Sequence, residues 1–166
     1  MKQVFNHLFH YHFSENKRLL ALAQQLESKQ LHDEVKYSIG SIMNHLQHLV
    51  NVDDGWLSDI SELVPFIDDP KELGLDALME FTRDIEKRMF TFLAEQSDDD
   101  FFRKPIKEGE DKELYLWQIL FHVINHATDH RAQLHRLLHD VGEKTHSQDY
   151  VFYAYDNEVG QDNSKD

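Results

Sequence analysis

The sequence predicts an all-α protein, a four-helix bundle, and two observations favour that class. Four stretches of about twenty residues or more repeat their apolar residues at helical spacing. The chain of 166 residues contains only six glycines and three prolines, which is few for an all-β protein built on tight turns. We therefore predict a single domain over residues 1–156, followed by a polar, disordered tail over residues 157–166.

The first two predicted helices cover residues 4–26 and 35–63. Each carries an apolar stripe that is expected to face the core of a bundle. The first stripe is Val4, Leu8, Tyr11, Leu19, Leu22 and Leu26; the second is Ile39, Ile42, Met43, Leu46, Leu49, Val50 and Leu57. Residues 64–76 then break the period with two prolines and a glycine, which predicts an irregular connection.

The third and fourth predicted helices cover residues 76–96 and 113–141. Asp76 is a suitable N-cap for the third helix, and Gly142 stands where the fourth helix needs a C-cap. The inward stripe of the third helix is Leu78, Phe81, Ile85, Met89, Phe92 and Leu93.

Two other segments have weaker patterns. The polar connection between the third and fourth helices contains Pro105 and Gly109, and residues 101–116 could hold a short hairpin. Residues 149–156, "DYVFYAYD", are rich in aromatic side chains, so we expect this last segment of the domain to pack against the helices.

The charge of the chain excludes several classes of partner. It carries 31 acidic and 17 basic residues, a formal net charge of −14, which repels nucleic-acid phosphates and anionic membranes. No run approaches the roughly 18 apolar residues of a membrane span. The N-terminal segment has no small-residue cleavage site of the signal-peptide type. We therefore expect a soluble, cytoplasmic protein that binds neither nucleic acid nor membrane.

The chain contains no cysteine. This excludes disulfides, a cysteine nucleophile and a thiolate metal site within the chain. Any metal must be held by His, Asp or Glu, and any thiol that takes part in its chemistry must come from outside.

The twelve histidines are the most informative residues, and three of them stand four apart in "FHVINHATDH". On a helical wheel, His130, His126 and His122 lie about 40°, 80° and 120° from the apolar centre, all on one flank. A pair of histidines four apart can bind one metal from a single helix, although such a pair is also typical of a half-buried polar edge. His135 and His139 fall on the other side and are expected to be solvated.

The earlier helices offer further histidines. The second helix has a second stripe, consisting of Ser41, His45, His48, Val52 and Trp56, which is typical of a helix that borders a cleft. The wheel does not choose between His45 and His48. On the first helix, His12 lies nearest the apolar stripe and is expected at the edge of the core, whereas His7 and His10 are expected on the surface.

Three segments, taken together, resemble the DinB/YfiT-like family over about 150 residues of the chain. Residues 116–142 match its fourth-helix motif at His126, His130, Arg131, Gln133, Leu137, Leu138 and Gly142. Residues 38–57 match its second helix, in a register that selects His48 and is followed by Trp56 and Leu57. Residues 11–20 match at Tyr11, Asn16, Arg18, Leu19 and Leu20, but Ser14 stands where the family has a tryptophan.

The resemblance implies an up-down-down-up four-helix bundle with a long crossover between helices 2 and 3, and a homodimer. It implies one divalent metal ion per chain, held by His48, His126 and His130. Zinc is our first choice for this ion, with nickel, iron or manganese as alternatives. The expected neighbours, in the pocket or behind the ligands, are His45, His122, Asp129, Gln133, His12 and Trp56.

Three hypotheses for function follow. The first is a metal-dependent S-transferase or hydrolase that uses a low-molecular-weight thiol, because superfamily relatives are thiol-dependent enzymes. The second is a metal-binding stress-response protein without catalytic turnover. The third is a metal-free bundle whose histidines respond to pH. The sequence does not identify a general acid or base.

Overall fold

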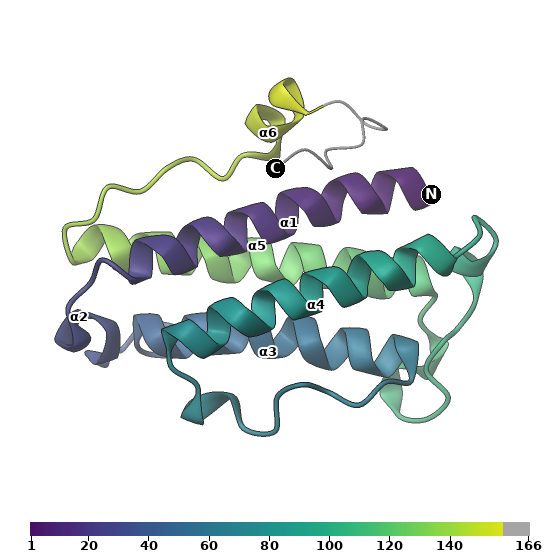
Figure 1. Ribbon diagram of the computed structural model, residues 1–166, viewed down its shortest axis with the longest axis horizontal. Coiled ribbons are helices and arrows are strands. Elements are labelled where there is room, and N and C mark those ends of the chain that lie inside the picture. The colour runs from purple at the N-terminus through teal and green to yellow at the C-terminus, as the bar shows by residue number, and fades with distance from the viewer. Residues whose placement is uncertain (158–166) are drawn as a thin grey trace.

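The computed structural model describes residues 1–157, and within that range its regular structure is entirely helical, without a β-strand (Figure 1). The four long helices are α1 (Lys2–Ala23), α3 (Ile42–Ser61), α4 (Leu75–Glu95) and α5 (Leu116–Asp140). The shorter elements are α2 (Ser28–His32), α6 (Tyr150–Asp156) and the 3₁₀ turns η1 (Pro70–Glu72), η2 (Asp100–Phe102) and η3 (Glu110–Glu113). The all-α prediction is confirmed.

The four long helices lie side by side around one apolar core (Figure 1). Both α1 and α3 contact α4 and α5, and residues 62–74 run back along the bundle before α4 begins (Figure 1). The fully buried centre includes Phe9, Phe13, Leu57, Leu78, Ile85, Leu134 and Leu138. Burying one such side chain contributes roughly 1.5–3 kcal/mol, so the apolar stripes account for the cohesion of the bundle. No helix in the described part is long and apolar enough to cross a membrane.

The second long helix begins seven residues later than predicted, at Ile42 rather than at residue 35. Ser38 and Gly40 adopt left-handed backbone conformations, with φ of 51° and 97°, which ends any helical path through them. Ser41 then caps the helix, because its hydroxyl accepts a hydrogen bond from the Asn44 amide at 3.2 Å. Ile39, predicted to face the core, is 39% exposed in this loop.

Other predicted boundaries differ less. The first helix ends at Ala23 rather than at residue 26, and Val4 of its predicted inward stripe is 53% exposed. Residues 101–116 form two 3₁₀ turns instead of a hairpin. Gly142 has a left-handed φ of 96° just past α5, and its amide donates to the His139 carbonyl at 3.0 Å, as expected for a glycine at a helix end.

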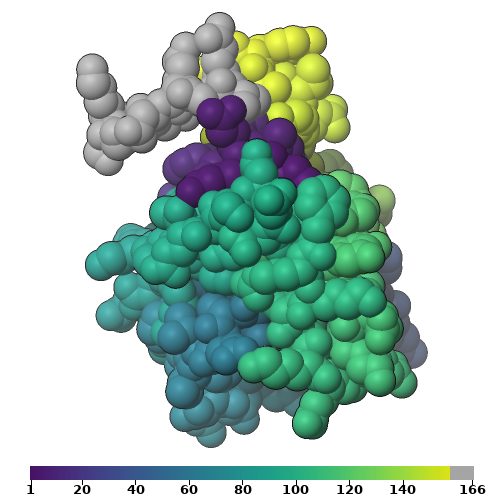
Figure 2. Space-filling model, turned by 90° about the vertical axis from the view of Figure 1, so that its right-hand side faces the viewer, coloured from purple at the N-terminus to yellow at the C-terminus, as the bar shows by residue number. Residues whose placement is uncertain are grey.

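The aromatic segment after α5 forms the helix α6 and lies against the N-terminal half of α1. Figure 2 shows α6 in yellow beside the purple start of α1. The ring of His7 packs against Tyr153 with centroids 5.3 Å apart, and His7 is only 7% exposed, so its predicted surface position is wrong. The helical wheel could not show this, because the partner comes from 146 residues later in the chain. Residues 158–166 of the predicted disordered tail lie outside the described part.

A buried polar cluster ties three of the long helices together. Arg131 of α5 is fully buried and donates hydrogen bonds to Asn16 Oδ1 at 3.0 Å and His12 Nδ1 at 3.3 Å, both on α1. Because His12 Nδ1 accepts, its Nε2 carries the proton and donates to Asp53 Oδ2 of α3 at 2.9 Å. Asn16 Nδ2 donates to the same oxygen at 3.0 Å. The positive charge of the Arg131 guanidinium therefore compensates the negative charge of the Asp53 carboxylate. The side chains of His12 and Asn16 lie between the two and connect them by hydrogen bonds.

This cluster makes Arg131 critical for stability. We expect Arg131→Met to destabilise the protein by about 3–5 kcal/mol, because the Asp53 carboxylate would remain buried without its cation. The measurement is urea unfolding followed by circular dichroism. The matched control is Arg136→Met on the exposed side of α5, which should change stability by less than about 0.5 kcal/mol.

A double variant separates charge balance from packing. Adding Asp53→Asn to Arg131→Met removes the unbalanced carboxylate, so the double variant should be more stable than Arg131→Met alone. Simple addition of the two destabilisations would show that the cluster acts through packing only.

Candidate metal centre

The histidines of α3 and α5 approach each other where the two helices pack together. The buried residues of α5, Leu116, Ile119, Val123, Ala127 and Leu134, fix the rotation of that helix about its axis. With that face inward, the flank that carries His126 and His130 turns toward α3, which contributes His48. The structure thus brings together the three histidines selected from the sequence.

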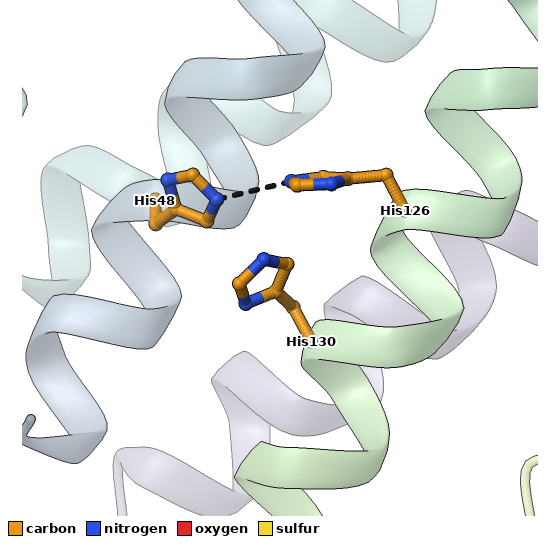
Figure 3. A group of neighbouring side chains, drawn as sticks. All are labelled: His48, His126 and His130. Atoms are coloured by element: carbon orange, nitrogen blue, oxygen red, sulfur yellow. Dashed lines mark hydrogen bonds between the residues drawn. The ribbon is translucent and has the colours of Figure 1, made fainter. Parts of the chain in front are cut away.

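The three rings form a compact group (Figure 3). One nitrogen from each ring lies within 4.8 Å of a nitrogen of the other two, and all three side chains are half-buried. His48 Nε2 and His126 Nε2 are 3.0 Å apart, so one donates a hydrogen bond to the other. The His130 ring centroid lies 4.4 Å from each of the other two centroids, and one of its nitrogens points toward them (Figure 3).

The electrostatics of the group favour neutral imidazoles. Burial, followed by the neighbouring His48 and His126, lowers the pKa of His130 to about 4. Burial is also the largest cause of the lowered pKa of His48 and of His126. Near pH 7 the three rings therefore keep nitrogen lone pairs available to a ligand.

These distances and donors fit a divalent cation. Metal–nitrogen bonds of about 2.0–2.1 Å in a tetrahedron place ligand nitrogens roughly 3.3 Å apart. The observed 3.0 Å between His48 and His126 is within a few tenths of an ångström of that spacing. A set of three imidazoles leaves at least one coordination position for another molecule.

His45 lies behind the group rather than in it. Its side chain is fully buried, and its Nδ1 donates to the Ser41 carbonyl at 2.9 Å, which leaves Nε2 with a lone pair. That Nε2 has no hydrogen-bond partner among residues 1–157, and neither does Nδ1 of His130, whose ring centroid is 6.2 Å away. The helical wheel did not choose between His45 and His48. In the structure His45 is fully buried, whereas His48 is half-buried and belongs to the group with His126 and His130.

Asp129 and Gln133 form a polar edge beside the group. Gln133 Nε2 donates to Asp129 Oδ2 at 3.0 Å, and Gln133 Oε1 accepts a hydrogen bond from Ser38 in the loop before α3. The Asp129 carboxylate acts to raise the pKa of both His126 and His130, against the larger effect of burial. Asp129 therefore supplies negative charge next to the group, and Gln133 connects α5 to the loop.

The remaining predicted neighbours divide into two kinds. His122 is exposed, its ring lies 5.5 Å from that of His126, and Trp56 packs edge-on against it at 5.4 Å. These two residues border the group. His12 does not, because it belongs to the buried cluster with Asp53 and Arg131.

A hollow of about 340 Å³ adjoins the group and is lined by His48, Asn51 and Lys71, among others. It is large enough for a small molecule next to His48, the one member of the group that lines it. A larger hollow of about 910 Å³, between α3 and the start of α4, contains none of the three histidines. We therefore regard the smaller one as the space relevant to this site.

A family model supports the resemblance of the three sequence segments. The model of the DinB family matches residues 1–163, almost the whole chain. The chain belongs to the DinB family. A search of curated proteins finds no match. Membership in the DinB family, together with the three clustered histidines, indicates a site that could hold a metal.

Sequence reasoning missed one group of residues in this DinB family protein. Glu15, His135 and His146 also place one potential ligand atom each within 4.8 Å of the others. His135 was expected in solvent, but it is half-buried, because the segment after α5 covers it. Only the path of that segment reveals the group, and no local pattern in the sequence predicts it.

Proposed function

We propose that this protein binds one divalent metal ion at His48, His126 and His130. The observation that supports the proposal most strongly is the convergence of three neutral imidazoles from two helices onto one point (Figure 3). Without a cation, this arrangement packs three rings together for a single mutual hydrogen bond. With a cation, each ring would supply one nitrogen lone pair, and bonds from His48 and His126 to the ion would replace the hydrogen bond between them.

Zinc is the first choice for the ion, with nickel, iron and manganese as alternatives. Three uncharged nitrogen ligands suit zinc, nickel and iron better than manganese, magnesium or calcium, which prefer oxygen. The bound ion would retain its double positive charge and lower the pKa of a water or thiol in the open position. Asp129 lies close enough to offset part of that charge.

We further propose that the open position serves a low-molecular-weight thiol. The chain has no cysteine of its own, and the hollow beside His48 offers room for a small molecule. Asn51 and Lys71, which line that hollow, suit a thiol that carries polar or anionic groups. In this proposal, the chain's residues orient the thiol and the half-buried imidazoles limit the access of water.

Two alternatives differ from this proposal in testable ways. A metal-binding stress protein without turnover would keep the ion but gain nothing from a thiol. A metal-free bundle that responds to pH is disfavoured, because the pKa of His130 is about 4 and those of its two neighbours are also lowered. Such histidines change charge below the physiological range.

The family also supplies two expectations about architecture. We propose its up-down-down-up order of helices, which the return of residues 62–74 along the bundle supports (Figure 1). The homodimer remains a prediction that follows from the resemblance.

The metal assignment predicts which variants lose the ion. Protein purified without a histidine tag should retain one tightly bound zinc per chain after dialysis against a mild chelator. His126→Ala and His48→Ala should each weaken zinc binding by more than about tenfold, because each removes a direct ligand. Elemental analysis after dialysis measures the retained metal.

The control for these variants is His139→Ala, which alters an exposed histidine on α5. It should retain zinc like the wild type. If the His126 and His48 variants also retain stoichiometric zinc, or if the wild type retains none, this assignment is wrong.

The thiol proposal predicts a proton-linked binding event. Zinc-loaded protein should bind 2-mercaptoethanol and release about one proton, because a metal-bound thiol loses its proton. Calorimetry in buffers of different ionisation enthalpy measures that release. Ethylene glycol, which has oxygen in place of sulfur, is the control and should bind much more weakly; equal binding of the two would favour the non-catalytic alternative.

A further inference from the structure

The second group of ligand-type side chains joins three separate segments of the chain. Glu15 comes from α1, His135 from α5, and His146 from the segment that connects α5 to α6. One ligand atom from each lies within 4.8 Å of the others, and Glu15 is only 3% exposed. None of the three belongs to the His48 group.

The carboxylate of Glu15 is shared between two partners. Its Oε2 accepts a hydrogen bond from His146 Nε2 at 2.7 Å, and its Oε1 contacts Arg18 Nη1 at 3.0 Å. Arg18 is more than half exposed, so water screens its charge. One carboxylate oxygen and one imidazole nitrogen therefore already meet at the centre of the group.

His135 is the observation that points to a ligand. Both of its ring nitrogens are buried and lack a hydrogen-bond partner among residues 1–157. A neutral imidazole presents one N–H and one lone pair, and leaving a buried polar atom unpaired costs about 1–3 kcal/mol. Its ring stands almost perpendicular to that of His146, with centroids 4.9 Å apart. Burial, and then His146, lowers the pKa of His135, so its lone pair is free near neutral pH.

We propose that Glu15, His135 and His146 form a second divalent-cation site, with zinc as the ion. Two imidazoles and one carboxylate are an established zinc ligand set, and they leave a position for water. On binding, the ion would take the place of the proton on His146 Nε2, which moves to Nδ1 of the same ring, so that His146 ligates as a neutral imidazole. This proposal does not depend on the His48 group.

The role of this site is to fasten residues 143–149 across α1 and α5. The same segment is already held at Gln148, whose carbonyl accepts a hydrogen bond from Tyr11 and whose Oε1 accepts one from Arg131 Nε at 3.0 Å. Beyond it, Tyr150 and Tyr153 of α6 cover His7. A cation at His146 would add a second anchor and connect the position of α6 to the availability of metal.

The decisive variant is Glu15→Gln. Glutamine keeps one oxygen that can accept the hydrogen bond from His146 Nε2, while its amide nitrogen takes the place of the oxygen beside the exposed Arg18. It is a much poorer zinc ligand than a carboxylate. If His146 is held only by its hydrogen bond to residue 15, that contact should survive the substitution. A zinc site should be lost.

The experiment is a calorimetric titration of the metal-stripped full chain with zinc chloride. We expect two equivalents for the wild type, loss of only the weaker one in Glu15→Gln, and loss of only the tighter one in His130→Ala. The expected weakening at the second site is more than about tenfold. His139→Ala is the matched control and should keep both equivalents.

Hydrogen exchange of the amides in residues 143–149 gives a readout that does not depend on the first site. Zinc should slow their exchange in the wild type and in His130→Ala, but not in Glu15→Gln. If Glu15→Gln binds as much zinc as the wild type, or if zinc leaves the exchange of this segment unchanged in His130→Ala, the second site is overturned.

Discussion

The buried guanidinium of Arg131 is the interaction on which the arrangement of the helices depends. Through Asn16 and His12 it reaches the Asp53 carboxylate, so α1, α3 and α5 share one buried hydrogen-bonded cluster. Such a cluster tolerates little movement, because each displaced partner leaves a buried polar atom unpaired. Apolar contacts supply most of the cohesion, and this cluster acts together with the apolar faces of the helices to determine how the three helices are rotated against one another.

That rotation determines where the histidines point. Asp53 follows His48 by five residues, which turns the two side chains about 140° apart on α3. Directing Asp53 into the interior therefore turns His48 toward the edge of the α3–α5 contact. On α5, Arg131 directly follows His130, so the inward guanidinium sets the imidazole on the adjoining flank. The polar cluster and the candidate metal centre are consequently two results of the same helix orientation.

The sequence predicted the parts of this site that depend on helical spacing. The spacing of four between His126 and His130 was enough to place those two rings on one flank of a helix. His48 was different, because the wheel left it equal to His45, and only the family register selected it. The start of α3 was missed, since the backbone reversal at Ser38 and Gly40 depends on local conformation that an apolar stripe does not encode. The second group was also missed, because His146 reaches Glu15 only through the path of the final segment.

Both groups suit a chain without cysteine. A protein that lacks thiolates must bind transition metals through imidazole and carboxylate groups. The twelve histidines of this chain provide the imidazoles. The two groups differ in what surrounds them. At the first, His48 lines a hollow of a size that could admit a small molecule, whereas the second includes His146 of the segment that joins α5 to α6.

Anomalous diffraction at the zinc absorption edge, from crystals grown with zinc, would locate a metal bound by the three histidines. We expect a peak about 2.0–2.1 Å from one nitrogen each of His48, His126 and His130. A fully zinc-loaded crystal with no peak among those three rings would contradict a metal site at these histidines.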